Sequence, residues 1–270
     1  MKNILIPYDF SGNSENTLTY GIQLAKEFSA NISLLNVIPY PVVTPEIGMP
    51  AFSYQEMMRD DLTELQALSV KIKKSEPSIG TINCFCEMGD VTEAIGTHCK
   101  RHPVDFVVMG IYHHGNKLMQ ALMGSNAIDA AHTIKCTVIV VPPGITYKKP
   151  TTIAFAQSQD ELKNTSVEKA KSISALFNAE LQLIHVVNEH HHFTPAEVNT
   201  ESVGAHQPHK LFVVTDKKVS EGVLGMLDNR LIDMIMIEPQ EHNVFYKLFH
   251  ESVSKEIAFA SPVPVVLIHG

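Results

Sequence analysis

The sequence has no tryptophan, only four cysteines and no excess of positive charge. Its 21 Lys and Arg residues face 29 Asp and Glu residues, for a net charge of −8, which argues against general binding to nucleic-acid phosphates. Four cysteines exclude a disulfide-stapled scaffold and favour a reducing, cytoplasmic setting. No apolar run reaches the roughly 20 residues that a membrane-spanning helix needs. The apolar stretch at residues 4–7 is too short for a signal peptide.

The chain contains two copies of one unit. Residues 25–35 align without a gap on residues 174–184, at a shift of 149, and residues 105–109 align on residues 233–237, at a shift of 128. The second copy therefore lacks 149 − 128 = 21 residues between these stretches. A length of 270 residues, with 44% of them apolar, is enough for two globular domains.

The joint between the copies lies in the turn-rich segment 142–150, so we expect domains at residues 1–144 and 151–270. Apolar strands alternate with amphipathic helices, which predicts a buried parallel sheet with helices on both faces. In the second copy, the polar segment 190–208 predicts a loop where the first copy has its long helix. For the first copy the expected strands are 3–7, 32–38, 81–87, 105–109 and 137–141, and the expected helices are 14–29, 54–74, 91–99 and 125–132.

Candidate ligand residues follow the predicted strands of the first copy. Ligands of open α/β sheets bind outside the carboxyl ends of the strands. Pro7 and Asp9 stand at the end of the first strand, Val37 at the end of the second, and Met109 and Gly110 at the end of the fourth. The Asp9 carboxylate could accept ribose hydroxyls, or it could simply form a turn or cap a helix.

Three glycines, Gly110, Gly115 and Gly124, punctuate the stretch after the fourth strand. Glycines let the backbone approach a ligand closely, although any strand-to-helix turn uses them. Ser125 and Asn126 open the helix that follows, and a helix start offers unpaired N–H groups that suit phosphate. Ser125 could cap that helix or donate its hydroxyl to a phosphate oxygen.

In this order, these residues resemble the universal stress protein family, and the whole chain resembles a tandem two-domain member. The resemblance covers residues 1–144 strongly and the remainder weakly. It implies Rossmann-like (adenine nucleotide alpha hydrolase-like) domains, each a five-stranded parallel sheet that pairs with another domain through its last strand. The matching segments are residues 4–11, Val37, residues 107–110, Gly124–Ser125 and residues 136–142.

The resemblance implies that the first domain of this stress-response protein binds ATP or a related adenine nucleotide, with Mg²⁺ or Mn²⁺ only as a companion of the triphosphate. The family's phosphate motif is Gly-x2-Gly-x9-Gly-Ser/Thr. Here the spacing is Gly-x4-Gly-x8-Gly-Ser, one residue longer, so the inner loop does not carry over atom for atom. The implied adenosine contacts are Pro7, Asp9 and Val37, and the implied triphosphate contacts are Met109, Gly110, Gly115, Gly124, Ser125 and Asn126.

The second copy is expected to be silent for nucleotide. Carboxylates that stand where phosphates would lie repel them, and their side chains fill the space that bare backbone would leave. Ser158 takes the place of Asp9, Glu238 that of Gly110 and Glu251 that of Gly124. The silent copy would then serve as a built-in pseudo-dimer partner, with Thr137–Val141 meeting Val265–Ile268 in one chain. Two such chains could also form a homodimer.

Binding is expected rather than catalysis. The sequence has no Gly-x-Ser-x-Gly elbow and no P-loop, and nothing in it positions a water, although slow ATP hydrolysis stays open. One alternative is an interaction scaffold that binds no nucleotide. Another is metal or small-ligand binding through the His-rich second domain, at His190–His192, His206 and His209, for which a solvated polar loop is the simpler interpretation. The cysteines Cys84, Cys86, Cys99 and Cys136 are interpreted as structural.

Overall fold

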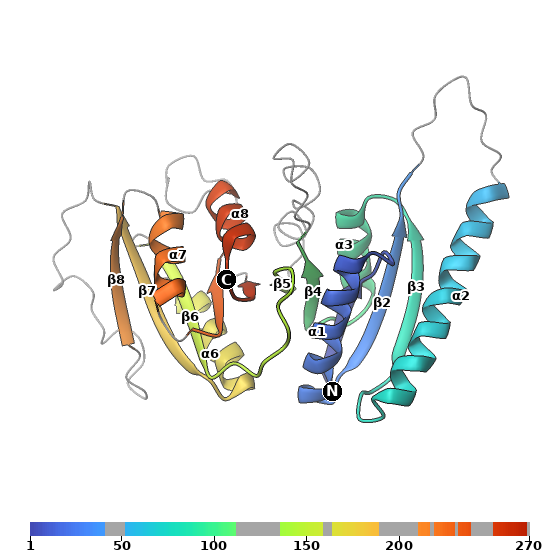
Figure 1. Ribbon diagram of the computed structural model, residues 1–270, viewed down its shortest axis with the longest axis horizontal. Coiled ribbons are helices and arrows are strands. Elements are labelled where there is room, and N and C mark those ends of the chain that lie inside the picture. Colours follow the sequence, from blue (N-terminus) through green and yellow to red (C-terminus); the bar gives the residue numbers. More distant parts are fainter. Residues whose placement is uncertain are drawn as a thin grey trace, which may run out of the picture. The chain divides into compact units, whose positions relative to one another are not determined.

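The computed structural model describes residues 1–40, 52–111, 136–158, 164–188, 210–216, 219–229, 232–238 and 251–268. The chain divides into two compact units, Met1–Val138 and Ile139–Gly270 (Figure 1). Within the described ranges, no helix combines the length and the apolar character needed to span a bilayer. The predicted helix at 125–132 and the predicted loop at 190–208 lie outside the described residues.

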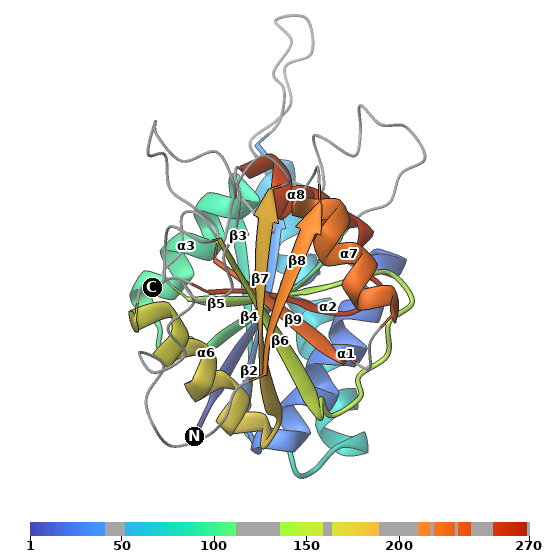
Figure 2. The same cartoon turned by 90° about the vertical axis from the view of Figure 1, so that its left-hand side faces the viewer.

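The first unit is a parallel sheet in the strand order β3-β2-β1-β4. Helices α1 and α3 lie on opposite faces of this sheet (Figures 1 and 2), which confirms the predicted α/β architecture. A further strand, β5 (Thr137–Val141), runs across the point where the two units divide. The elements before it are β1 (Asn3–Pro7), α1 (Gly12–Phe28), β2 (Asn31–Ile38), α2 (Phe52–Ser75), β3 (Ile82–Met88), α3 (Val91–Arg101) and β4 (Phe106–Gly110).

Strand β1 is the centre of this sheet and is covered on both faces. Ile4, Leu5 and Ile6 are fully buried, which explains why the strand is a continuous apolar run rather than an alternating one. Helix α1 packs very closely on it, since a Cβ added at Gly21 would lie 2.5 Å from Ile6 Cδ1. The helix begins two residues earlier than predicted because Ser11 caps it, its hydroxyl accepting the Ser14 N–H at 3.2 Å.

The second unit is a five-stranded parallel sheet in the order β10-β9-β6-β7-β8. Its central strand, β6, lies between β7 and β9 as β1 lies between β2 and β4. The described elements are β6 (Thr152–Ser158), α6 (Asn164–Phe177), β7 (Glu180–Asn188), β8 (Lys210–Asp216), α7 (Val219–Asn229), β9 (Met234–Ile237), α8 (Glu251–Ala260) and β10 (Val265–Leu267).

The strand registers repeat between the units. Asn3 faces Asn31 in the first unit and Thr152 faces Glu180 in the second, an offset of 28 residues in both. The pairing of β1 with β4 has an offset of 106 − 4 = 102, and that of β6 with β9 has an offset of 234 − 153 = 81. The difference, 102 − 81 = 21, equals the deletion inferred from the sequence shifts, so both copies build the same central strand pairing.

An aspartate at the amino ends of the strands makes equivalent contacts in the two sheets. In the first unit, Asp105 accepts the Asn3 backbone N–H at 2.9 Å and the Lys2 ammonium at 3.0 Å. The Asp105 N–H in turn donates to the Asn3 carbonyl at 2.9 Å. These bonds fasten the start of β4 to the start of β1, and so hold the two strands in register.

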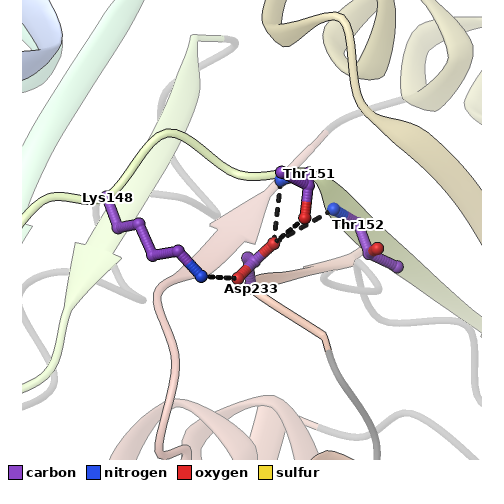
Figure 3. Close-up of polar contacts among 4 residues, drawn as sticks. All are labelled: Lys148, Thr151, Thr152 and Asp233. Atoms are coloured by element: carbon purple, nitrogen blue, oxygen red, sulfur yellow. Dashed lines mark hydrogen bonds and ion pairs between the residues drawn. The ribbon is translucent and has the colours of Figure 1, made fainter.

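In the second unit, Asp233 does the same for β9 and β6 (Figure 3). Its carboxylate accepts the backbone N–H groups of Thr151 at 2.8 Å and Thr152 at 3.1 Å, and the Lys148 ammonium at 3.0 Å. Burial by itself would raise the pKa of Asp233, but the hydrogen bonds from Thr151, Lys148 and Thr152 outweigh it and lower the pKa from 3.8 to about 2.

We expect Asp233→Asn to destabilise the protein by about 2 kcal/mol at neutral pH, because the pKa of the carboxyl is lower in the folded chain than in the unfolded chain. A group with a lowered folded pKa stabilises above its unfolded value, so this contribution should disappear as the pH falls from about 4 to about 2. Denaturant unfolding at a series of pH values measures the difference between variant and parent.

The matched control is Asp60→Asn, since the Asp60 side chain is 75% exposed and should change little. A loss in Asp233→Asn that stays constant down to pH about 2 would contradict the assignment of the lowered pKa.

Candidate functional site

A pocket of about 110 Å³ opens at the carboxyl ends of β1, β2 and β4. The chain runs from β1 to β2 on one side and returns to β4 on the other, so this is the switch point of the sheet, where α/β proteins bind ligands. The five predicted site residues that the structure describes all line this one pocket: Pro7, Asp9, Val37, Met109 and Gly110. The other four, Gly115, Gly124, Ser125 and Asn126, lie outside the described residues.

Sequence reasoning missed six residues that line the same pocket: Tyr8, Asn13, Ser14, Thr17, Leu35 and Val91. Asn13 and Thr17 are one helical turn apart at the start of α1, and this i, i+4 polar pair after the first strand is the signal that could have found them. Val91 is the first residue of α3, so the amino-terminal ends of two helices, α1 and α3, reach the pocket. Both ends bring partial positive charge, which suits an anionic ligand.

The turn between β1 and α1 presents Asp9 to the pocket. Asp9 is exposed, and its Oδ1 accepts the Ser11 N–H at 3.1 Å. The next residue, Phe10, has a φ of 59°, in the left-handed region that a non-glycine residue seldom adopts. The interpretation of Asp9 as a turn residue is confirmed, whereas the helix cap is Ser11. A carboxylate has several acceptor positions, so this turn is compatible with a ligand contact.

Buried polar contacts fix the end of β1 beneath this turn. Asn36, only 4% exposed, donates its side-chain N–H to the Tyr8 carbonyl at 3.0 Å. The Tyr8 backbone N–H donates to the Leu35 carbonyl at 2.9 Å, and its hydroxyl donates to Glu15 at 2.7 Å. Burial, followed by this bond to Glu15, raises the pKa of Tyr8 well above its usual range. Tyr8 therefore stays a neutral hydroxyl that ties the turn to α1.

Gly110 has no room for a side chain. A Cβ built there would lie 2.7 Å from Asn13 Nδ2 and would also collide with Thr17 Oγ1. Thr17 is almost fully buried and donates its hydroxyl to the Asn13 carbonyl at 3.0 Å. The end of β4 and the first turns of α1 thus approach at bare backbone, which leaves the polar side chains of α1 beside the pocket.

In the second unit a carboxylate occupies the corresponding place. By the sequence shifts of 128 and 149, Glu238 takes the position of Gly110 and Ser166 that of Thr17. The fully buried Ser166 donates its hydroxyl to Glu238 Oε2 at 2.7 Å. A negative side chain therefore fills the position that is bare backbone in the first unit.

The other candidate ligands form no metal site in the described part of the chain, where no group of three or more His, Cys, Asp or Glu residues could hold an ion. The cluster of His190–His192, His206 and His209 lies outside the described residues. Cys86 donates to Asn36 Oδ1 at 3.6 Å, and Cys84 is hydrogen-bonded to Ser69.

The fold and the pocket define a Rossmann-like α/β protein with a pocket at the switch point of its first sheet. The sequence model of the Universal stress protein family matches residues 1–142, and the chain belongs to that family. It is 31% identical over 143 residues to the universal stress protein MJ0531 of Methanocaldococcus jannaschii, a match that covers 52% of this chain and 81% of that relative.

Solved structures show the same fold over both units. The universal stress protein of Archaeoglobus fulgidus DSM 4304 superposes with a TM-score of 0.70 at 20% identity, over 99% of this chain and 96% of that one. A Pseudomonas aeruginosa PAO1 protein of unknown function, PA1789, superposes with a TM-score of 0.60 at 11% identity, over 100% and 92%. The duplicated architecture is therefore shared beyond this chain.

We expect Gly110→Ala to destabilise the protein by about 1–3 kcal/mol, because the new methyl group overpacks the contact with α1. Thr17→Ala removes one of the two colliding groups, so the double variant should lose less stability than the sum of the single variants. Denaturant unfolding of the four proteins measures this coupling.

Gly12→Ala is the matched control, because a Cβ at Gly12 meets nothing within 4 Å. Strictly additive losses for Gly110→Ala and Thr17→Ala would mean that the two positions do not meet as described.

Proposed function

We propose that the first unit binds ATP or a related adenine nucleotide at the switch-point pocket, and that the chain acts in the stress response through this site. One observation carries the proposal. Residues that the family pattern assigns to the nucleotide, from three separate strand ends, surround one pocket. Membership of the Universal stress protein family supports the stress-response role.

The described lining residues suit the parts of a nucleotide. Asp9 is the acceptor for ribose hydroxyls, while Pro7 and Val37 lie beside the adenosine. The amino-terminal ends of α1 and α3 give the pocket partial positive charge for the phosphates. Bare backbone at Gly110 lets the chain approach them, and Gly115, Gly124, Ser125 and Asn126 complete the triphosphate contacts by the family pattern. Mg²⁺ or Mn²⁺ enters only with the triphosphate.

The second unit contributes structure rather than a second nucleotide site. The hydrogen bond from Ser166 holds the Glu238 carboxylate at the position that corresponds to Gly110, whose bare backbone would face the phosphates in the first unit. A like charge at that position opposes phosphate binding most strongly where water is excluded. In this proposal the second unit is the pseudo-dimer partner of the first, and Thr137–Val141 pairs with Val265–Ile268.

Binding without turnover is the activity that this pocket supports. Among its described lining residues, Asp9 is the only carboxylate and there is no histidine. A general base must reach the proton that it abstracts, and in this proposal the ribose hydroxyls and the Ser11 N–H occupy the Asp9 carboxylate. The nucleotide therefore acts as a signal that the protein senses rather than as a substrate.

Asp9→Asn tests the site directly. An asparagine oxygen can still accept the Ser11 N–H, so the turn persists, but the charged acceptor for the ribose is lost. We expect ATP affinity to fall about tenfold in calorimetric titrations of the full chain, as for a lost charge-assisted hydrogen bond.

Asp60→Asn, which changes an exposed carboxylate on α2, is the control and should bind ATP as the parent does. Unchanged affinity in Asp9→Asn would remove Asp9 from the site. A parent protein that releases no heat with ATP would contradict the proposed function itself.

A further inference from the structure

Two of the four cysteines meet in the first unit. Cys99 lies in the last turn of α3 and Cys136 stands immediately before β5. Their thiols are hydrogen-bonded to each other, and both side chains are half-buried. Cys99 is eight residues beyond Val91, which lines the pocket, so it lies about 12 Å further along the helix axis. Cys99 therefore lies at the opposite end of α3 from Val91, which lines the pocket.

The remaining two cysteines behave differently, although they are closer in sequence. Cys84 and Cys86 are alternate residues of β3, so their side chains leave the strand on the same face. Each has a partner other than the second thiol, since Cys84 bonds Ser69 and Cys86 bonds Asn36. The four thiols thus form one pair in mutual contact and two that are engaged elsewhere.

The contact also affects the protonation of the pair. The hydrogen bond to Cys136, together with burial, raises the pKa of the Cys99 thiol, so Cys99 keeps its proton. A protonated thiol is a poor nucleophile, so the contact between the two sulfurs, rather than an activated thiolate, is what favours a disulfide here.

We propose that Cys99 and Cys136 form a reversible redox site, in which a hydroperoxide converts the thiol pair to an intramolecular disulfide. This inference does not depend on the proposed nucleotide binding. One sulfur of the pair attacks the peroxide and breaks its O–O bond, which gives a sulfenic acid; the leaving oxygen takes the thiol proton and departs as an alcohol, or as water from hydrogen peroxide. The second sulfur then attacks the sulfenic sulfur, and the hydroxyl leaves with the proton of this second thiol as water. The two thiols together lose two electrons, which the peroxide gains. A small-molecule thiol reduces the disulfide again by thiol–disulfide exchange.

The disulfide would close a loop of 136 − 99 = 37 residue steps, which begins in α3 and includes β4. Closing a loop of this size restricts the unfolded chain, so the oxidised protein should be more stable than the reduced one. The closed loop also spans the stretch that carries Gly110, Gly115, Gly124 and Ser125.

Peptide mapping of the reduced full-length protein after treatment with hydrogen peroxide tests the proposal. We expect one dominant cross-linked pair of peptides, containing Cys99 and Cys136 and two hydrogens lighter than the separate peptides, which a thiol reductant separates again. The Cys84→Ser/Cys86→Ser variant should give the same product, and Cys99→Ser should give none.

Thermal unfolding supplies the second measurement. Oxidised parent protein should melt several degrees above the reduced form, while peroxide should give Cys99→Ser no such rise. The proposal is overturned if the parent yields no Cys99–Cys136 product under conditions that oxidise free glutathione. A Cys84–Cys86 link or an intermolecular link as the main product overturns it equally. Because the mapping uses the parent chain, a variant that fails to fold does not affect the result.

Discussion

The pairing of β1 with β2 on one side and β4 on the other is the constraint on which the rest of the first unit depends. It places the carboxyl ends of three strands at one edge, and with them Pro7, Val37 and Met109. Asp105 holds the same pairing from the opposite edge. The pocket is a consequence of strand order, so its residues are far apart in sequence and adjacent in space.

Both copies of the unit keep this strand pairing, but they differ in the residues at the carboxyl edge of the sheet. The register of the central strands is the same in both units, and Asp233 repeats the contacts of Asp105. What differs is the contact between the end of β4 or β9 and the helix beside it, which is α1 in the first unit and α6 in the second. Gly110 leaves it bare in the first unit, whereas Glu238 fills it and is held by Ser166 in the second. Backbone hydrogen bonds between the strands hold this scaffold together. It tolerates the change from Gly110 to Glu238 because the side chain at this position does not take part in the strand pairing.

The sequence predicts the part of this structure that depends on local pattern. Continuous apolar strands between amphipathic helices predict the parallel α/β fold, and residues at strand ends predict which side chains share an edge. It does not reveal contacts that depend on how closely two elements approach. Thr17 beside Gly110, and the thiol contact between Cys99 and Cys136, bring together residues that no local period connects. Helix α1 begins at Gly12, two residues before its predicted start, because Ser11 caps it. The apolar stripe of a helix does not show where its cap lies.

The most direct test of the account is the number of ATP molecules that one chain binds, counted by native mass spectrometry as the ATP concentration rises. The account predicts one for the parent chain. It predicts none for the chain with Gly110→Glu and Thr17→Ser, which transfers the second unit's carboxylate and hydroxyl to the first. Two nucleotides per parent chain would show that Glu238 does not silence the second unit. Retention of one by the doubly substituted chain would place the nucleotide away from the pocket at Gly110.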